Sequence, residues 1–426
     1  MDSEAISAVR QLFEEIDAAI PRESESQAQR ARRVFELLDH DEGGVYALDQ
    51  PSYQRTRIDE LGTWTDDPWD GPTYGVDAST TRPLDYNNGL IVDTAYAKTA
   101  VTGDTANRAV EHTGRVVGVA YLDDDETTLH GKTIESDHVT AELIRFPETT
   151  QEPRNLSKSV ATVAQRWSES QQAVDTLDDV DGPLFLDGSV FPLGIVYWLL
   201  LDHAGNRSPA GSWDLPTKIV ANYVEVIDRL YERGLPVIGI VKTSSMAQVL
   251  DALREKIAQN NIRGEHGRFV DVPWIRDHQF LTEVLRHDDL DYLTYTSWFV
   301  DRGQEINGTR YDVLEPLAGR LDHGEPKDYR RAFCYVRLPR TGDLLRIEAP
   351  HLMVQDEETR ERVRLKALKE IARMRGVPRA IHRADRLARI SQENRDKICN
   401  MIERTEASYD HNWDGRWSDL NDNPDL

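Results

Sequence analysis

Short apolar runs and amphipathic stretches alternate through the middle of the chain. Residues 73–78, 183–187 and 236–241 are short apolar runs bounded by turn residues, a pattern that predicts buried strands. Residues 216–233 carry apolar side chains at helical spacing directly before the last of these runs, which predicts a helix. This alternation of strand and helix is typical of an α/β fold with a central sheet.

The same patterns continue towards both ends of the chain. Further helices are predicted at 1–40, 157–177, 246–260, 356–375 and 380–403. Further strands are predicted at 292–299, 332–338 and 343–348. We therefore expect an N-terminal helical segment over 1–66, one large α/β domain over 67–403 with a β-rich insertion at about 88–150, and an acidic disordered tail over 404–426.

Composition adds that the surface is strongly acidic. The chain holds 75 acidic against 51 basic residues, and its formal net charge of −24 is spread along the sequence rather than gathered in one tail. Such a surface suits concentrated salt, where repulsion between charges is screened within roughly 3 Å. The alternative is an acidic protein that binds basic partners. Because nucleic-acid binders usually carry a basic surface, any contact with DNA must come from local arginine clusters or from bound cations.

The sequence also counts against several classes of protein. It contains no phosphate-binding Walker loop, serine-hydrolase elbow, zinc-protease helix or Cys/His zinc spacing. The two cysteines, Cys334 and Cys399, are far apart and are expected to be reduced thiols. The first residues do not resemble a signal peptide, and the longest apolar run, 190–201, is too short to span a membrane. We therefore expect a cytoplasmic protein.

Two of the predicted strands end in an acid that is followed by a small residue and a serine. Asp77 ends one in Val-Asp-Ala-Ser, and Asp187 ends the other in Leu-Asp-Gly-Ser. Carboxylates at the carboxyl ends of neighbouring strands meet in the crevice where α/β proteins bind ligands. Their mutual repulsion is relieved when a divalent cation lies between them. The alternative is that each aspartate caps the turn that follows its strand.

Two further residues could take part in the same chemistry. Glu169 lies on the predicted helix that precedes the Asp187 strand, although a helical glutamate is often a solvated surface residue. Lys242 directly follows the strand at 236–241 and could hold a phosphate as a point charge. The alternative is that this segment starts a helix, with one of the following serines as its cap.

The segment 376–391 is the most basic stretch of the chain. His382 and Asp385 lie three residues apart on one helix face, which could add metal ligands. Contacts with phosphate groups are expected from the arginines of this segment, Arg379, Arg383, Arg386 and Arg389. The alternative is an exposed basic helix without a ligand. A second acid–histidine pair, Glu348 and His351, follows a predicted strand and is interpreted as structural, with a place along a DNA path as the alternative.

The order of these motifs resembles the NurA nuclease family, which acts with the HerA helicase-translocase in archaeal DNA end resection. Over roughly residues 70–395 the order is strand–Asp–small–Ser, helix–Glu, strand–Asp–Gly–Ser, strand–Lys–Thr–Ser, and a Gly-x-Pro helix that ends in Ala-x-x-Leu-Ala-x-Ile-Ser. The resemblance implies an α/β fold with a ribonuclease-H-like core, in which helices flank a mixed central sheet, and Mn²⁺ or Mg²⁺ held by acidic ligands. It places the family's acids on Asp77, Glu169 and Asp187, and its lysine on Lys242.

The C-terminal segment departs from the family pattern at two positions. Val377 stands where the family has tyrosine, and Asp385 stands where it has histidine. An aspartate keeps a metal ligand there, and a hard, charged one that suits Mg²⁺ or Mn²⁺. The same two changes also fit an inactive paralogue.

The resemblance implies a Mn²⁺- or Mg²⁺-dependent deoxyribonuclease, cutting as an exonuclease or endonuclease in double-strand break repair. Four acids, Asp77, Glu169, Asp187 and Asp385, would hold two ions roughly 3.5–4 Å apart, and Lys242 would complete the catalytic set. The expected partners are DNA, a second copy of the chain and a hexameric HerA-type helicase, with no membrane, in a haloarchaeal host. One alternative is a NurA-like subunit that binds DNA ends or the helicase without cutting, and another is an acidic α/β protein with no nucleic-acid role.

Overall fold

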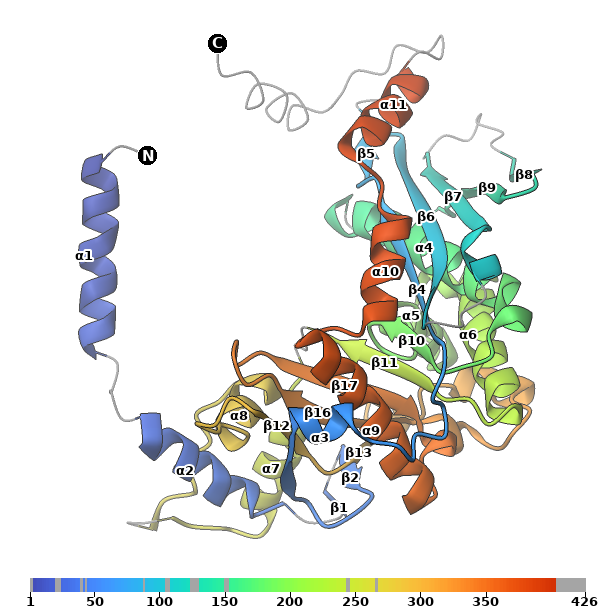
Figure 1. The fold of residues 1–426 in the computed structure, drawn as a ribbon. Helices are drawn as coiled ribbons and strands as arrows, with labels where there is room; N and C mark the ends of the chain where they lie inside the picture. The colour runs from blue at the N-terminus through green and yellow to red at the C-terminus, as the bar shows by residue number, and fades with distance from the viewer. Residues whose placement is uncertain are drawn as a thin grey trace.

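The structure of the chain is a computed structural model. It describes residues 3–19, 24–38, 41–42, 44–86, 89–103, 108–122, 130–148, 153–242, 246–264 and 267–403. The tail predicted over 404–426 lies outside the described residues. Figure 1 shows that α1 stands apart from the rest of the described chain, which is built around one large sheet.

The helices and strands have the following bounds. The helices are α1 (Ser3–Ala19), α2 (Ser24–Phe35), α3 (Ile58–Gly62), α4 (Pro153–Asp175), α5 (Leu193–His203), α6 (Leu215–Glu232), α7 (Gln248–Gln259), α8 (Asp277–Val284), α9 (Glu357–Met374), α10 (Arg379–Ala388) and α11 (Gln392–Glu403). The strands are β1 (Asp41–Glu42), β2 (Val45–Ala47), β3 (Tyr53–Arg57), β4 (Thr73–Thr80), β5 (Leu84–Asp85), β6 (Ile91–Thr102), β7 (Gly114–Tyr121), β8 (Lys132–Glu135), β9 (Val139–Arg145), β10 (Leu184–Asp187), β11 (Val237–Val241), β12 (Tyr292–Thr296), β13 (Phe299–Asp301), β14 (Gln304–Ile306), β15 (Thr309–Tyr311), β16 (Arg331–Arg337) and β17 (Leu344–Pro350).

The large sheet is mixed. Its strands follow the order β1-β2-β13-β16-β17-β11-β10-β4-β6-β7-β9-β8, with β3 paired to β12, β12 to β16 and β5 to β6. β10 runs parallel to both β4 and β11, whereas β17 is antiparallel to β11 and β6 is antiparallel to β4. The predicted α/β fold with a mixed central sheet flanked by helices is confirmed.

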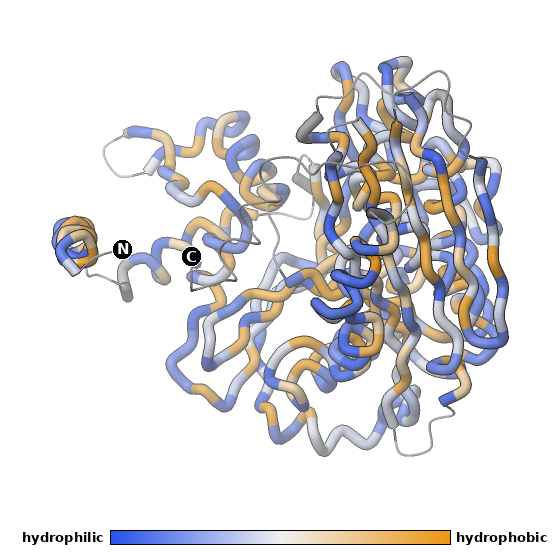
Figure 2. Tube along the Cα trace, turned by 90° about the horizontal axis from the view of Figure 1, so that it is seen from above, coloured by the Kyte–Doolittle hydropathy of each residue, from blue (hydrophilic) through white to orange (hydrophobic). Residues whose placement is uncertain are grey.

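Helices cover both faces of the sheet at its centre. Leu184 and Leu186 of β10 belong to a core that includes residues of α4, α5 and α6. Phe185, between them, belongs to a second core that includes residues of α9 and α10. Because successive side chains of a strand point to opposite faces, a strand covered on both sides must be apolar throughout. Figure 2 shows hydrophobic stretches running through the large body, with α1 lying outside it.

Two predicted elements are each divided in the structure, so their predicted bounds are wrong. The helix predicted over 380–403 is broken at Arg389, which is extended (φ −61°, ψ 123°). The break is explained by Ser391, whose hydroxyl accepts a hydrogen bond from the backbone N–H of Asn394 (3.2 Å) and thus caps α11. The strand predicted over 292–299 is divided into β12 and β13. Between them, the Ser297 hydroxyl accepts a hydrogen bond from the Ser52 backbone N–H (3.0 Å).

The segment 1–66, predicted to be helical, also contributes strands to the sheet. β2 pairs with β13, and β3 pairs with β12. The side chains of β3 are almost all exposed, so this strand has no apolar alternation by which it could be predicted. The strands of this segment therefore join the N-terminal residues to the main sheet.

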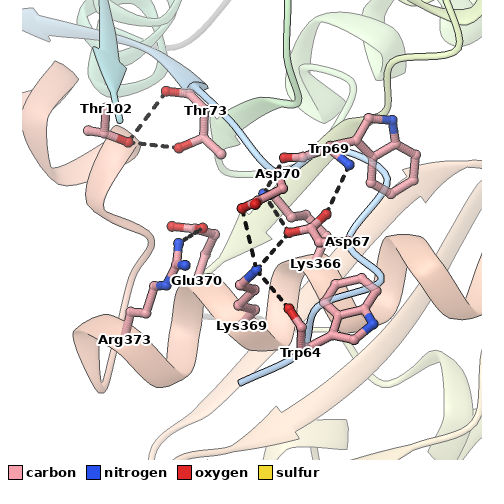
Figure 3. A network of polar contacts seen from close by, with 10 residues as sticks. All are labelled: Trp64, Asp67, Trp69, Asp70, Thr73, Thr102, Lys366, Lys369, Glu370 and Arg373. Carbon is pink, nitrogen blue, oxygen red and sulfur yellow. Dashed lines mark hydrogen bonds and ion pairs between the residues drawn. The ribbon is translucent and has the colours of Figure 1, made fainter. Parts of the chain in front are cut away.

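A buried ion pair ties the segment before β4 to helix α9 (Figure 3). Asp67 Oδ2 accepts hydrogen bonds from Lys366 Nζ and Lys369 Nζ, each 3.0 Å away, and no side chain of the three is more than 4% exposed. Lys366 also donates to the Trp69 carbonyl (2.8 Å), and Lys369 donates to the Trp64 carbonyl (3.4 Å). The approach to β4 is therefore fixed by charge as well as by backbone pairing.

The longest apolar run lies largely in α5. Ile195, Val196, Leu199 and Leu200 of this helix are buried in the first core, so its apolar character serves packing within the fold. In the part of the chain that the structure describes, no helix is both long enough and apolar enough to cross a bilayer.

Candidate active site

Asp77 and Asp187 lie at the same edge of the sheet. β4 and β10 are parallel, and their register pairs Val76 with Leu186. The next residue along each strand is the acid, Asp77 on β4 and Asp187 on β10. Because neighbouring strands lie roughly 4.8 Å apart, the two aspartates are neighbours at the point where β10 ends. Asp187 is the last residue of β10, whereas Asp77 lies within β4, which continues to Thr80 in pairing with β6.

Helix α10 brings Asp385 to this edge, because it packs directly against the backbone of β4. A Cβ added at Gly75 would lie 2.6 Å from the carbonyl carbon of Ala380, so only glycine allows this approach. Ala380, Ile381 and Ala384 form the buried side of α10. Asp385 follows them on the exposed side, and its charge acts on Asp77.

Glu169 reaches the site from α4, which is anchored at the end of β4. The Gln165 amide donates to the Ala78 carbonyl (2.9 Å), one residue beyond Asp77. Glu169 is 2% exposed. Its Oε1 accepts a hydrogen bond from the Tyr223 hydroxyl (2.7 Å), and its Oε2 accepts one from Arg166 Nη1 (2.9 Å). Both carboxylate oxygens therefore have a protein donor that fixes their orientation.

Arg166 and Tyr223 are site residues that the sequence patterns do not reveal. Tyr223 lies on the amphipathic face of α6, where an aromatic side chain is expected simply to fill the core. Arg166 lies three residues before Glu169 on one helix face, a spacing that would have suggested an ion pair. The pKa of Arg166 is raised mainly by the negative charge of Glu169, and the charge of Asp77 raises it further.

The carboxylates act on one another electrostatically. The pKa of Asp77 is raised to about 7, first by burial and then by the negative charges of Glu169, Asp187 and Asp385. The pKa of Glu169 is also raised by burial, against the opposing effect of Arg166. Asp77 on β4 therefore experiences the negative charges of acids on α4, β10 and α10, a repulsion that a shared cation would relieve.

The donor set fits a divalent cation by charge and by ligand type. Its ligands are all carboxylate oxygens, which suit Mg²⁺ and Mn²⁺. Asp77 faces three like charges, which a cation would neutralise. Within the described residues, however, no three His, Cys, Asp or Glu side chains already form a cluster able to hold a metal ion. As they are placed, the acids therefore do not form a coordination shell.

A lysine stands at the same edge. Lys242 follows β11, the other parallel neighbour of β10, and its Nζ lies 2.7 Å from Asp187 Oδ2. The Lys242 side chain is 45% exposed, so it can reach a solvent-borne anion. The serines proposed as alternative caps, Ser244 and Ser245, lie outside the described residues.

The four arginines of the basic C-terminal segment differ in their surroundings. Arg379, Arg386 and Arg389 are exposed. Arg383 instead uses Nε and Nη2 to bind the two carboxylate oxygens of Glu111, with 2.7 Å from Nη2 to Oε2. Its guanidinium is thereby committed to joining α10 to the segment before β7, and the other three are left to face solvent.

The raised pKa of Asp77 predicts how stability depends on pH when divalent ions are removed. An unfolded aspartate ionises near pH 4, whereas folded Asp77 keeps its proton until about pH 7. The unfolded state therefore binds fewer protons between these values, and the free energy of unfolding falls as pH rises through this window, by up to about 4 kcal/mol. Urea unfolding in EDTA at pH 5 and pH 8 should show the fall in the wild type and a smaller one in Asp77→Asn. Equal falls in both proteins would contradict the prediction.

Comparison with known proteins identifies one family and several solved structures of low sequence identity. A model of the NurA domain matches residues 71–390, a range that includes Asp77, Glu169, Asp187 and Asp385. No protein of curated function matches the chain. A solved structure of the NurA nuclease from Sulfolobus solfataricus is 12% identical, with 94% of this chain and 96% of that one covered and a TM-score of 0.49.

Two other solved structures are similar at about the same distance. NurA with manganese is 11% identical over 82% of this chain and 93% of that one, with a TM-score of 0.42. NurA bound to dAMP and manganese is 11% identical over 82% of this chain and 92% of that one, with a TM-score of 0.40.

Proposed function

Since the NurA domain covers most of it, the chain belongs to the NurA family, and from this premise we propose that it is a metal-dependent DNA nuclease. The observation that carries the proposal is the buried Asp77 carboxylate, which interacts with Glu169, Asp187 and Asp385 at one edge of the sheet. A cluster of like charges is unfavourable unless a cation is shared among them. The nuclease domain is proposed to be residues 67–403.

We propose Mn²⁺ as the ion, with Mg²⁺ as the alternative, because an all-carboxylate donor set suits both. Asp77, Asp187 and Asp385 would bind it directly. Glu169, whose two oxygens already accept hydrogen bonds, would hold its charge beside them. When bound, a pair of such ions would supply a hydroxide nucleophile at neutral pH and would stabilise the charge on the leaving oxygen.

Other residues of the chain would position the DNA. Lys242 Nζ is adjacent to Asp187 and partly exposed, so it is placed to contact the phosphate that is cleaved. Arg379 and Arg386 of α10, and Arg389 directly after it, are exposed and would contact the backbone phosphates on either side. Arg383 is left out of this set because Glu111 holds it.

The cellular role is proposed from the family. The protein would trim DNA ends in double-strand break repair as a homodimer, in complex with a HerA-type hexameric helicase. The acidic surface would suit a haloarchaeal cell, where molar salt screens its repulsion.

The second candidate function is a NurA-like subunit that binds DNA ends or the helicase without cutting. It is favoured by the internal cations of the site, since Arg166 pairs with Glu169 and Lys242 pairs with Asp187. Such pairing partly satisfies the acids without a metal ion. Asp385, whose charge reaches Asp77, favours the nuclease.

Removing the metal tests the proposal. The purified protein, kept in molar KCl, is incubated with end-labelled linear DNA and either Mn²⁺, Mg²⁺ or EDTA. We expect shortening of the DNA with Mn²⁺ and none with EDTA, because the acids alone supply no nucleophile. If the protein binds the DNA but shortens it under none of the three conditions, the result would support the non-cutting subunit instead.

A further inference from the structure

The turn that follows Asp187 is fastened to a neighbouring strand by a buried glutamate. Glu348 of β17 accepts two hydrogen bonds on Oε2, one from the Ser189 hydroxyl (2.6 Å) and one from the Val190 backbone N–H (3.2 Å). Glu348 is 1% exposed. Hydrogen bonds to a carboxylate are stronger than those between neutral groups, so these two contacts fix the two residues that come directly after Gly188.

Two glycines allow the turn to come this close. Glu348 is paired with Gly239 of β11, and a Cβ at Gly239 would lie 2.6 Å from the Gly188 carbonyl oxygen. Gly188 itself adopts φ +130°, a conformation that other residues rarely reach. The Glu348 side chain can therefore reach past β11 to the turn at the end of β10.

Glu348 is held in place by buried arginines. Its Oε1 lies 2.9 Å from Arg346 Nε and 3.7 Å from Arg331 Nη1. The Arg346 side chain is fully buried, and its guanidinium stacks 3.8 Å from the centre of the Phe333 ring. Arg331 is in turn paired with Asp301. The carboxylate thus has a fixed orientation and a balanced charge.

Arg346 also contacts the start of helix α7. Its Nη1 donates to Gln248 Oε1 (3.1 Å), and Gln248 is the first residue of α7. The segment between β11 and α7 begins with Lys242. Arg346 and Glu348 lie two residues apart on one face of β17, so one strand contacts both the turn after Asp187 and the first residue of α7.

We infer that Glu348 is a positioning residue for the metal site, which it controls through Ser189 and the turn after Asp187. The inference rests on the proposed function, because it assumes that Asp187 binds a cation. Residues that do not touch a metal ion but orient one of its ligands typically change the metal affinity by about 10- to 100-fold when they are removed. On this inference, Asp187 binds the cation, Gly188 allows the chain to turn, and Ser189 holds the turn in place through Glu348.

The sharpest test replaces Ser189, because Ser189→Ala removes one hydrogen bond and leaves the ion pairs of Glu348 in place. Isothermal titration with Mn²⁺, in EDTA-stripped protein and molar KCl, should give a dissociation constant about 10-fold higher than that of the wild type. The urea midpoint should stay close to that of the wild type. Ser208→Ala is the control for loss of a serine hydroxyl elsewhere in the chain, because the Ser208 hydroxyl accepts a hydrogen bond from the Ala210 backbone N–H (3.1 Å). It should leave the Mn²⁺ affinity unchanged.

Glu348→Gln provides a second, independent readout. It should weaken Mn²⁺ binding at least as much as Ser189→Ala, and the double variant should be no weaker than Glu348→Gln alone, because both changes break the same contact. Wild-type Mn²⁺ affinity in Ser189→Ala would overturn the inference while leaving the proposed function intact. Absence of Mn²⁺ binding in the wild type would overturn both. Equal losses in Ser189→Ala and Ser208→Ala would show a general effect of the lost hydroxyl and would also overturn it.

Discussion

Replacing Asp187 with alanine is expected to abolish Mn²⁺-dependent DNA cleavage. Asp187, the last residue of β10, lies beside Asp77 of the parallel strand β4, where a shared ion would need both carboxylates. Losing a ligand removes several kcal/mol of metal-dependent transition-state stabilisation, so the cleavage rate should fall by roughly 10³-fold or more. The rate is measured with end-labelled linear DNA under single-turnover conditions, with Mn²⁺ affinity measured in parallel.

The fold should survive this substitution. Asp187 is 21% exposed and its partner Lys242 is 45% exposed, and ion pairs of this kind contribute about 0–1 kcal/mol to stability. Removing Asp187 also removes a negative charge that acts on Asp77. Asp179→Ala is the matched control, because Asp179 is an exposed acid just before β10, and this variant should cleave at the wild-type rate. Cleavage by Asp187→Ala at the rate of this control would refute the assignment of the site.

The largest effect on stability is expected for Asp67→Ala. Its carboxylate is the shared partner of the Lys366 and Lys369 ammonium groups, both buried under the segment that leads into β4 (Figure 3). Removing one partner of a buried ion pair costs about 3–5 kcal/mol, because the remaining charge is left without compensation. Here two charges are left, so we expect at least the upper end of that range. The measurement is the free energy of unfolding by urea at pH 7.

Asp70 offers an internal comparison on the same segment. It lies 3.9 Å from Lys369 but its side chain is 79% exposed, so Asp70→Ala should change the free energy of unfolding by less than about 1 kcal/mol. The pKa of Asp67 is lowered in the fold: burial acts to raise it, but the two lysines more than offset this. Its stabilising effect is therefore present above the pKa of an unfolded aspartate and is lost as pH falls towards the folded value. Similar losses in Asp67→Ala and Asp70→Ala would contradict the account of the buried pair.

Sequence patterns predicted the central elements well because local rules decide them. β10 and β11 are covered on both faces, so their apolar runs are unbroken, and α6 carries its apolar side chains at helical spacing on one side. Asp77 and Asp187 stood out because an acid at the end of an apolar strand is unusual in a buried sheet. Their proximity follows from parallel pairing in register, which the sequence implied only through the order of its elements.

Other features depend on contacts between distant parts of the chain, which no local pattern encodes. Tyr223 is an ordinary core aromatic by spacing, and only the packing of α6 on α4 turns its hydroxyl towards Glu169. Arg383 has the same local pattern as Arg379 and Arg386, yet it is bound by Glu111 from a remote segment. The need for glycine at position 75 likewise becomes evident only from the packing of α10 against it.

The close contact between α10 and Gly75 has a consequence for the making of the protein in the cell. The chain leaves the ribosome N-terminus first, so β4 and β10 emerge long before α10, which carries Asp385. An unfinished chain therefore lacks part of the acidic set until its final portion has been translated and docked. Chains that end before α10 would carry the two strands without Asp385, and so without one of the four acids proposed to hold the metal ion.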